Sequence, residues 1–285
     1  MPAGLYLVAT PIGNLGDIGA RALSVLGQAD LVACEDTRTT RKLMNAHGLA
    51  PRLATYHEHN AARVRPGLIA RIKAGAAVAL VSDAGTPLVS DPGYKLVRAA
   101  IDEDLSVTAV PGASAPLAAL MVSGLPSDRF LFAGFLPPRT EARRKALAEL
   151  RAVPATLIVF ESARRLAESL ADMAATLGPR PAAVARELTK LHEEVRRGAL
   201  DRLADDYAGE DAPKGEVVVV IGPPGARATA LDEPEIDARL RVALAGGTSL
   251  RDAVAAVAAE AGQPRQLIYT RALALTRASD DADGR

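Results

Sequence analysis

Three short apolar runs in this chain each end in a turn rich in glycine, proline and small polar residues. The runs and their turns are residues 5–9 and 10–14, residues 78–81 and 82–87, and residues 107–110 and 111–115. Short apolar runs that stop at such turns are typical of buried parallel strands. The turns at the carboxyl ends of such strands form the ligand crevice of an open α/β sheet. The pattern therefore predicts an α/β fold with a ligand site built from these turns.

The first half of the chain alternates strand-like and helix-like units. Strands are expected at residues 4–9, 31–34, 78–81 and 106–110, and helices near 18–26, 37–46, 61–74, 93–102 and from 114. Such alternation predicts a mostly parallel sheet covered by helices on both faces. We expect this first α/β domain to span residues 1–123.

A second α/β domain is expected over residues 124–223. Strands are predicted at 130–135, 156–160, 182–185, 187–197 and 216–221, and helices at 139–151 and 163–177. The strand at 187–197 is a candidate for antiparallel pairing. A chain of 285 residues is long enough for two domains with their own cores, and we expect the ligand crevice between them.

The last segment, residues 224–285, is predicted to be a linker and a small helical module. Apolar residues in 250–261 recur at helical spacing, Gly262 ends that helix, and Pro264 opens another. The pair resembles a helix-turn-helix, and a docking or dimer module fits it equally well. The acidic tail from Ser279 is expected to be disordered.

Composition narrows the class of protein. Aromatic residues make up 3% of the chain and Trp is absent, which argues against the stacking platforms of sequence-tolerant single-strand binders. The single cysteine, Cys34, cannot form an internal disulfide and is expected in a strand core. No apolar run reaches the ~20 residues that span a bilayer, and the first strand begins too early for a signal peptide. We expect a cytoplasmic protein without a membrane partner.

Basic charge is concentrated in one segment of an otherwise neutral chain. Residues 38–73 contain eight Lys or Arg residues and one acid, Glu58, although the whole chain has 34 basic and 34 acidic residues. A surface of this kind suits a phosphate backbone, and a solvated helix face is the alternative. The candidate polyanion-binding side chains are Arg38, Arg41, Lys42, His57, His59 and Arg63.

The turns match no nucleotide-binding signature. Residues 13–19 form G-x-x-G-x-x-G, unlike the dinucleotide pattern, and a P-loop motif is absent from the sequence. Pro11 removes a backbone donor where a phosphate cradle needs one. A ligand held by a few amides, carbonyls and one carboxylate fits better. Asp83 can accept from ribose hydroxyls or an amine or can form the turn, and Ser114 can bind a carboxylate or cap a helix.

Eight sequence blocks resemble one family. They are residues 10–14 (TPIGN), 34–38 (CEDTR), 57–60 (HEHN), 81–94 (VSDAGTPLVSDPGY), 111–115 (PGASA), 132–137 (FAGFLP), 187–190 (ELTK) and 214–216 (KGE). Together they resemble the small-subunit ribosomal RNA methyltransferases of the tetrapyrrole methylase (class III) superfamily. Residues 161–165 (ESARR) depart from the usual Ser-Pro-His-Arg of that branch at the expected start of one helix.

The resemblance implies a fold, a reaction and partners. The fold is that of the tetrapyrrole methylases, with the donor S-adenosylmethionine between two domains, and the protein is a homodimer. The reaction is 2′-O-methylation of a cytidine in the decoding region of 16S rRNA, with the small ribosomal subunit as partner, so the polyanion-binding candidates become RNA-binding. By position, the resemblance implies the cofactor-binding residues Pro11, Ser82, Asp83, Gly85, Thr86, Ser114, Ala115, Phe160 and Leu188.

A 2′-hydroxyl is a very weak acid, so its position beside the methyl group and a base to accept its proton should supply most of the rate. Glu35 and Asp36 follow the second strand and are the candidate bases, with Lys190 and Glu193 as alternatives. Asp36 is equally a candidate to cap the helix that follows. The chemistry requires no metal, and the sequence contains no clear metal-ligand set.

Two other functions stay open. A tetrapyrrole or diphthamide-pathway methyltransferase shares this architecture, and a non-catalytic RNA-binding assembly factor could keep the fold without the reaction. The basic segment 38–73 and the C-terminal helices argue against the first, because a small carboxylate-rich substrate does not need so broad a surface. Retention of all three cofactor turns argues against the second.

Overall fold

The computed structural model describes residues 1–225, 233–261 and 263–283. By its internal contacts this part of the chain forms two compact units, residues 1–146 with 155–222 and residues 147–154 with 223–285. Both β-sheets belong to the first unit. The boundaries expected from the sequence at residues 123 and 223 stay predictions.

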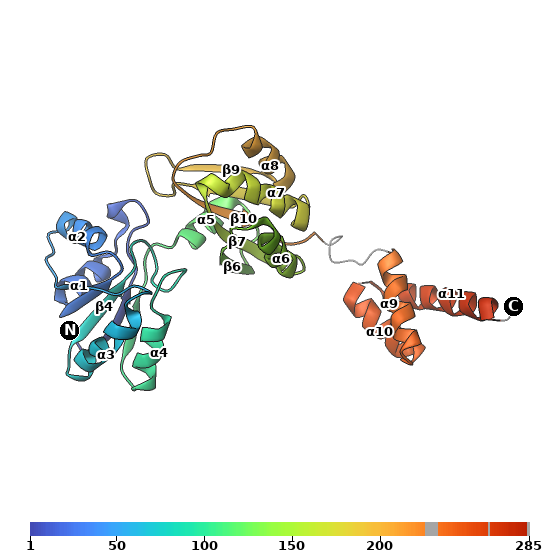
Figure 1. Cartoon of the computed structure of the whole chain (residues 1–285), viewed down its shortest axis with the longest axis horizontal. Coiled ribbons are helices and arrows are strands. Elements are labelled where there is room, and N and C mark those ends of the chain that lie inside the picture. The colour runs from blue at the N-terminus through green and yellow to red at the C-terminus, as the bar shows by residue number, and fades with distance from the viewer. Residues whose placement is uncertain (226–232, 262, 284–285) are drawn as a thin grey trace. The chain divides into compact units, whose positions relative to one another are not determined.

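The first sheet has five parallel strands in the order β3-β2-β4-β1-β5. They are β1 (Gly4–Val8), β2 (Leu31–Cys34), β3 (Leu53–Thr55), β4 (Ala77–Val81) and β5 (Val107–Val110). Of these strands, β4 is labelled in Figure 1. Strands β2 and β4 are buried at every position, including Cys34, which fits a parallel sheet covered on both faces. Strand β3 is a three-residue, partly exposed edge strand, and it was missed because it has no apolar run.

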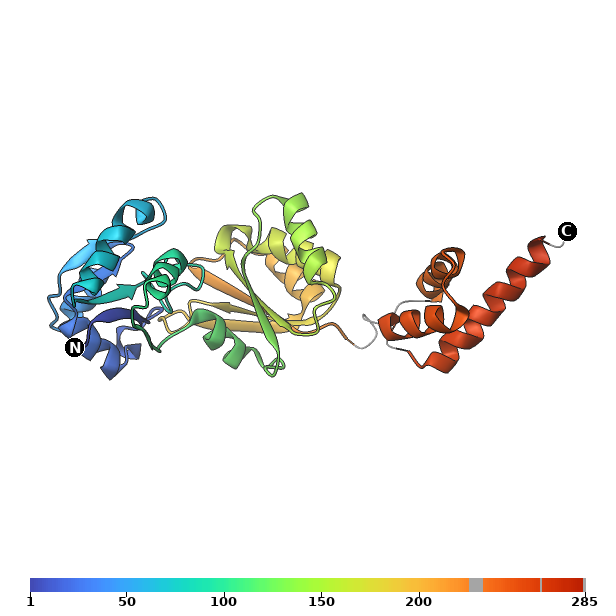
Figure 2. The ribbon, with the colours of Figure 1, turned by 90° about the horizontal axis from the view of Figure 1, so that it is seen from below.

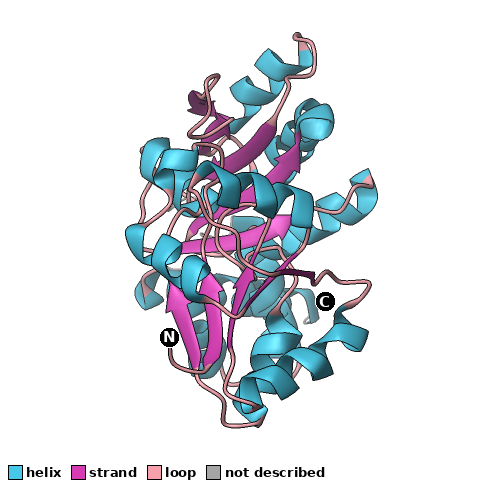
Figure 3. Ribbon diagram, turned by 90° about the vertical axis from the view of Figure 1, so that its left-hand side faces the viewer, coloured by secondary structure: helices cyan, strands magenta, loops and turns pink. Residues whose placement is uncertain are grey.

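Helices cover both faces of the first sheet, as Figure 3 shows with helices in cyan and strands in magenta. One core contains Leu26 and Met44 from α1 (Ala20–Gln28) and α2 (Thr37–Ala46). The opposite core contains Ile69 and Leu96 from α3 (Ala61–Lys73) and α4 (Tyr94–Asp102). The strand–helix alternation predicted for this half is therefore confirmed.

The second sheet is mixed, in the order β6-β7-β10-β8-β9. Strands β6 (Phe130–Phe135) and β7 (Thr156–Ser162) are parallel, and β10 (Glu216–Ile221), β8 (Pro181–Arg186) and β9 (Glu194–Ala199) pair antiparallel. Its helices are α5 (Ala115–Ser123), α6 (Thr140–Leu150), α7 (Leu166–Leu177) after a 3₁₀ turn (Ala163–Arg165), and α8 (Leu200–Ala208). Helix α5 follows β5 in the chain but packs on this second sheet.

One expected strand of the second sheet was drawn too long. The prediction covered residues 187–197, but β9 begins at Glu194. Glu187 and Thr189 have positive φ angles of 50° and 66°, which turn the chain between β8 and β9 and cannot continue a strand. The antiparallel pairing expected for this segment is confirmed. Helix α8 was not predicted, although Leu200, Leu203, Ala204 and Tyr207 give it a buried face.

The helical module contains α9 (Glu233–Ala245), α10 (Leu250–Ala261) and α11 (Arg265–Asp283), drawn in orange and red in Figure 2. Ile236 and Leu240 of α9 pack with Val254, Val257 and Ile268. Helix α9 lies in the segment where the sequence predicted a linker. Helix α11 extends past the expected start of the tail, and residues 226–232 and 284–285 lie outside the described residues. None of the helices in the described part of the chain combines the length and apolar character needed to cross a bilayer.

Candidate active site

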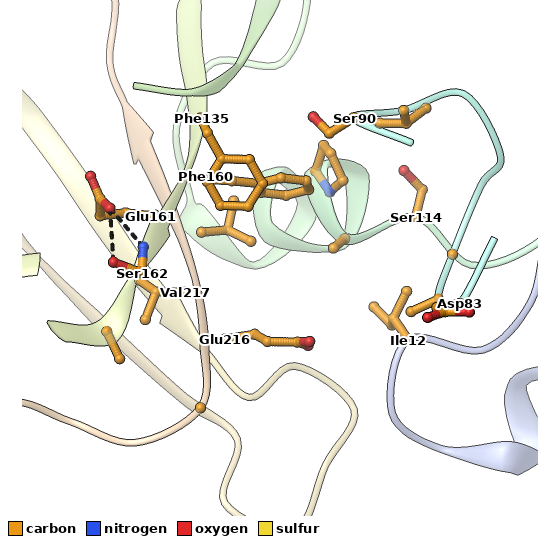
Figure 4. A pocket seen from close by; sticks show the side chains of 18 of the residues that line it. Ile12, Asp83, Ser90, Ser114, Phe135, Phe160, Glu161, Ser162, Glu216 and Val217 are labelled. Carbon is orange, nitrogen blue, oxygen red and sulfur yellow. Dashed lines mark hydrogen bonds between the residues drawn. The ribbon is translucent and has the colours of Figure 1, made fainter. Parts of the chain in front are cut away.

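A cavity of about 700 Å³ lies within the first unit, where the three predicted turns meet (Figure 4). The turn after β1 contributes Ile12, the β4–α4 loop contributes residues 83–86 and 89–91, and the turn after β5 contributes Ser114 and Ala115. The facing wall comes from the second sheet, through β6, β7 and the start of β10. The volume of the cavity lies within the range of small-molecule binding sites.

Hydrogen bonds lock the three turns to one another. Thr10 and Gly85 exchange two backbone hydrogen bonds of 2.9 and 3.1 Å, and the Thr86 hydroxyl donates to the Ala113 carbonyl at 3.0 Å. Gly85 has a φ of 77°, and a Cβ there would lie 3.1 Å from Ile12 Cγ2, so a side chain is disfavoured twice over. The Ser82 hydroxyl turns back to the carbonyls of its own loop at 3.1 and 3.2 Å. The cavity wall is thus a fixed backbone surface.

The structure places most of the expected cofactor-binding residues on this wall. Those that line the cavity are Asp83, Gly85, Thr86, Ser114, Ala115 and Phe160, whereas Pro11, Ser82 and Leu188 do not line it. Ser114 makes no side-chain hydrogen bond to cap α5, and Figure 4 shows its hydroxyl among the lining groups. Asp83 accepts a hydrogen bond from the Asp36 backbone N–H at 3.0 Å, so it connects the loops that follow β4 and β2.

Phenylalanines form an aromatic wall on the second sheet. All four phenylalanines of the chain lie on β6 and β7, and Phe160 contacts the rings of Phe132 and Phe135 at centroid distances of 4.9 and 5.3 Å. The pairing register of β6 shifts between Phe132 and Gly134, and Gly134 has a φ of 67°. Phe135, the next residue, lines the cavity. Phe135 remains 59% exposed. The sequence prediction missed this aromatic wall, because the aromatic content of the whole chain is low.

Asp91 lines the cavity and lies within the block 81–94, but it was not among the expected site residues. Burial raises the pKa of its carboxyl to about 6, helped by the nearby acids Glu35 and Asp83 and opposed by the Ser82 hydroxyl. Leu88 and Ser90 in the same loop have left-handed φ angles of 73° and 63°. Such backbone strain in non-glycine residues concentrates at functional sites.

The candidate bases expected from the sequence do not line the cavity. Asp36 caps α2, because its carboxylate accepts from the Arg38 backbone N–H at 2.8 Å. Hydrogen bonds from the Arg38 side chain and backbone lower the Asp36 pKa to about 2. Lys190 donates to Glu187 and Glu216 at 2.8 and 2.9 Å. Burial lowers the Lys190 pKa, but these two carboxylates outweigh it and raise the pKa overall. Glu35 lies close enough to influence Asp91.

Lys190 also belongs to a close contact between the first turn and the second sheet's loop. The Asn14 backbone N–H donates to the Thr189 hydroxyl at 3.2 Å. A Cβ on Gly13 would overlap the Lys190 side chain and the Thr189 hydroxyl. Only glycine therefore fits this contact without a shift.

The RNA-binding candidates lie on and around α2 and α3. Arg41, Lys42, His59 and Arg63 are exposed, while Arg38 is exposed but shares its guanidinium with Asp36 at 2.7 Å. His57 is only partly exposed, and its Nδ1 is buried without a hydrogen-bond partner. The structure thus presents most of the basic segment to solvent.

The chain resembles two protein-family models and several named proteins. The tetrapyrrole (corrin/porphyrin) methylase model matches residues 4–204, and an RsmI C-terminal HTH domain model matches residues 230–276. A protein of Mesorhizobium japonicum named ribosomal RNA small subunit methyltransferase I is 56% identical, covering 98% of this chain and 95% of its own length. A protein of the same name from Erythrobacter litoralis is 52% identical, covering 95% of each chain.

Solved structures share the fold at low sequence identity. A diphthine synthase matches with a TM-score of 0.61 and 20% identity, covering 82% of this chain and 93% of its own. Uroporphyrin-III C-methyltransferase from Thermus thermophilus, complexed with S-adenyl homocysteine, matches with a TM-score of 0.52 and 19% identity, covering 76% and 96%. The chain therefore belongs to the tetrapyrrole methylase family, in its ribosomal RNA small subunit methyltransferase I group, and is an S-adenosylmethionine-dependent methyltransferase.

Proposed function

We propose that this protein methylates the 2′-hydroxyl of a cytidine in the decoding region of 16S rRNA, within the small ribosomal subunit. The observation that carries the proposal is the 56% identity, over nearly the whole chain, to a protein named ribosomal RNA small subunit methyltransferase I. The sugar position and the nucleotide rest on the resemblance of the sequence blocks.

The cavity fits a cationic methyl donor with an aromatic ring system. Phe160 and Phe135 offer an apolar surface for the adenine, and the Asp83, Asp91 and Glu216 carboxylates offset positive charge. We propose that the lining residues bind S-adenosylmethionine and that Pro11, Ser82 and Leu188 support them from behind. When bound, the donor supplies an electrophilic methyl group with a neutral leaving group.

The basic surface is proposed to hold the RNA. Arg41, Lys42 and Arg63 are exposed, and His59 lies with them on the same segment. Side chains of this kind bind phosphates without reading sequence, so they would position the ribose rather than select the base. The residues of the cavity would then orient the 2′-oxygen and accept its proton.

A homodimer is part of the proposal. Met121 on α5 is 84% exposed and Leu117 on the same helix is 46% exposed. Large apolar side chains exposed together on one helix are typical of an interaction surface. Light scattering at micromolar concentration should give twice the chain mass of 29.6 kDa. We also propose the cytoplasm as its location, because that is where a bacterial ribosomal substrate is found.

The reaction is tested with small subunits from a strain that lacks this methylation. The protein and labelled S-adenosylmethionine should introduce label, and one ribose should become resistant to alkaline hydrolysis. Calorimetry on the same preparation reports donor binding separately. Label on a base contradicts the assigned chemistry, and saturable donor binding without any transfer favours a different substrate. Absence of donor binding favours an assembly factor.

A further inference from the structure

Tyr94 is the most exposed of the Phe and Tyr side chains in the protein. It is 72% exposed, whereas Tyr6, Tyr56 and Tyr207 are each at most 9% exposed. A tyrosine that belongs to a core buries its ring and usually finds a partner for its hydroxyl. Within residues 1–225, 233–261 and 263–283, no group makes a hydrogen bond or a ring contact with the Tyr94 side chain. The packing of the fold therefore does not account for this ring.

Tyr94 lies close to the cavity. It begins α4, directly after the β4–α4 loop, and Asp91 of that loop lines the cavity. Three residues of chain span at most about 11 Å, so Tyr94 Cα lies within that distance of Asp91 Cα. Gly93 packs the start of α4 onto β4, because a Cβ there would lie only 2.9 Å from Leu80 Cδ2. The backbone therefore holds the ring near the cavity.

Basic side chains surround the start of α4. Helices α3 and α4 pack side by side on one face of the first sheet (Figure 1). Lys95 Nζ lies 4.0 Å from Glu58 Oε1, and both side chains are exposed, which brings the start of α4 next to the turn before α3. His59 on this turn and Arg63 in the first turn of α3 are also exposed. Tyr94 is thus an exposed ring bordered by basic side chains.

An exposed ring among basic side chains suits unpaired RNA. Proteins hold such RNA through its phosphates and stack its splayed bases on aromatic side chains. A protein partner would instead favour a continuous apolar patch, but the nearest exposed residues of α4 are Lys95 and Arg98. The surroundings of Tyr94 therefore match RNA better than a protein surface.

We infer that the Tyr94 ring stacks on a base of the RNA, in the target nucleotide or one next to it, an inference that rests on the proposed function. A ribose can enter a cavity only after its nucleotide leaves the stack of neighbouring bases, and this unstacking costs free energy. Stacking on Tyr94 offsets part of that cost and holds the ribose in front of the cavity. Every base has a face that can stack, so Tyr94 positions the substrate without selecting the nucleotide.

The low aromatic content of the chain is consistent with a single stacked base. Platforms that bind single strands without sequence preference stack successive bases on several aromatic side chains. Here the cavity would hold one ribose, so one ring beside it is sufficient.

The first test compares wild type with Tyr94→Ala and Tyr94→Phe, and Ile101→Ala is the matched control. Ile101 lies on the same helix and is 51% exposed, but it is about 10 Å further along the helix axis. Methylation of unmethylated small subunits is measured at saturating donor over a range of subunit concentrations. Donor affinity is measured separately by calorimetry.

Tyr94→Ala should raise the subunit concentration for half-maximal rate about 5- to 150-fold, the loss expected for one stacked base. Tyr94→Phe should stay within about twofold of wild type, because stacking does not use the hydroxyl. The slope of log affinity against log salt should not change in Tyr94→Ala, because no charge is lost. Donor affinity should not change either, because Tyr94 is not among the residues lining the cavity.

The second test observes the ring directly. The chain contains no Trp, so Tyr94→Trp introduces a single indole whose fluorescence reports its surroundings. A short single-stranded RNA of the decoding-region sequence should quench this fluorescence saturably, because a stacked base contacts the indole. Heparin, a polyanion without bases, should bind the basic surface but leave the fluorescence unchanged. Ile101→Trp should respond to neither probe.

The inference is overturned if Tyr94→Ala behaves like Ile101→Ala, if Tyr94→Phe loses as much as Tyr94→Ala, or if heparin quenches Tyr94→Trp as strongly as RNA does. A Tyr94→Ala protein whose mass by light scattering differs from that of wild type also overturns it, because the ring would then serve a protein interface. If wild type methylates no ribose, the proposed function fails, and quenching by RNA still decides the inference by itself.

Discussion

At the scale of single residues, Gly13 lies where no side chain fits. Its added Cβ would overlap Lys190 and approach the Leu188 carbonyl at 3.1 Å. Gly13→Ala should therefore lower the free energy of unfolding by about 1–3 kcal/mol, measured by urea denaturation. Gly67 is an exposed glycine inside α3 with nothing within 4 Å of an added Cβ. Gly67→Ala should instead stabilise the protein by about 0.5–1 kcal/mol, and equal losses at both positions would contradict the steric argument.

Phe135 tests the aromatic wall at the same scale. It lines the cavity and is 59% exposed, so its removal should weaken stacking without disturbing the core. Phe135→Ala should cost about 1 kcal/mol of donor binding, about a fivefold rise in the dissociation constant, measured by calorimetry. Phe130→Ala is the control, because Phe130 lies on the same strand, is 46% exposed and is not among the residues lining the cavity. Equal effects from both variants would remove Phe135 from the binding site.

At the scale of elements, α6 and α7 are joined by a buried ion pair. Arg143 is fully buried and donates to Asp172 through Nε at 2.7 Å, to Glu168 at 2.9 Å and to the Pro138 carbonyl at 3.1 Å. Arg143→Met would strand the buried Asp172 carboxylate and should cost about 3–5 kcal/mol of unfolding free energy.

Arg144 gives the matched control for this pair. It also contacts Asp172 at 2.7 Å but is half exposed, so Arg144→Met should cost less than about 1 kcal/mol. The double variant Arg143→Met/Asp172→Leu should recover most of the loss, because no buried charge remains. Denaturant unfolding that ranks Arg144→Met as the more damaging variant would refute the assignment.

Substitutions of Asp36, at the start of α2, can distinguish a capping role from a catalytic one. Asp36 caps this helix through the Arg38 N–H, and asparagine caps equally well. Asp36→Asn should therefore keep the melting temperature and most of the methylation rate, whereas Asp36→Ala should lower the melting temperature. A large loss of rate in Asp36→Asn, with the melting temperature retained, would restore Asp36 as a candidate base.

Because its pKa is lowered to about 2, the contribution of Asp36 to stability is present above its ordinary pKa near 3.8 and declines as pH falls toward 2.

At the scale of the whole molecule, the distribution of charge matters more than its sum. The net charge is zero, so binding to RNA must depend on the local basic surface. Arg41→Ala and Lys42→Ala should each weaken binding to small subunits and reduce the slope of log affinity against log salt by about 1. Arg202→Ala, an exposed arginine on α8, should leave the slope unchanged. Filter binding should be measured between 50 and 200 mM salt, a range over which a protein that makes a few phosphate contacts loses affinity by about tenfold. If Arg41→Ala and Lys42→Ala leave the salt slope unchanged, the basic surface does not bind the RNA.

Local sequence patterns predicted most of the helices and strands. The wrong or missing predictions have physical causes. The buried strands were found because their runs are continuously apolar, and α2 was found because its cap and length are local features. Strand β3 escaped because it gains its pairing from β2 rather than from its own sequence. The strand expected at 187–197 was too long because left-handed residues are not visible in residue types such as Glu187 and Thr189.

The buried strands, the three turns and the family could be inferred from residue order alone, since each depends on residues that are neighbours in the chain. Folding in three dimensions sets which acids line the cavity and which serve as caps or ion-pair partners. Asp91, Asp83 and Glu35 influence one another across loops that follow different strands, and Glu216 meets Lys190 from another element. Desolvation and charge coupling depend on such distant neighbours, so the chemistry of a carboxylate cannot be inferred from its place in the chain.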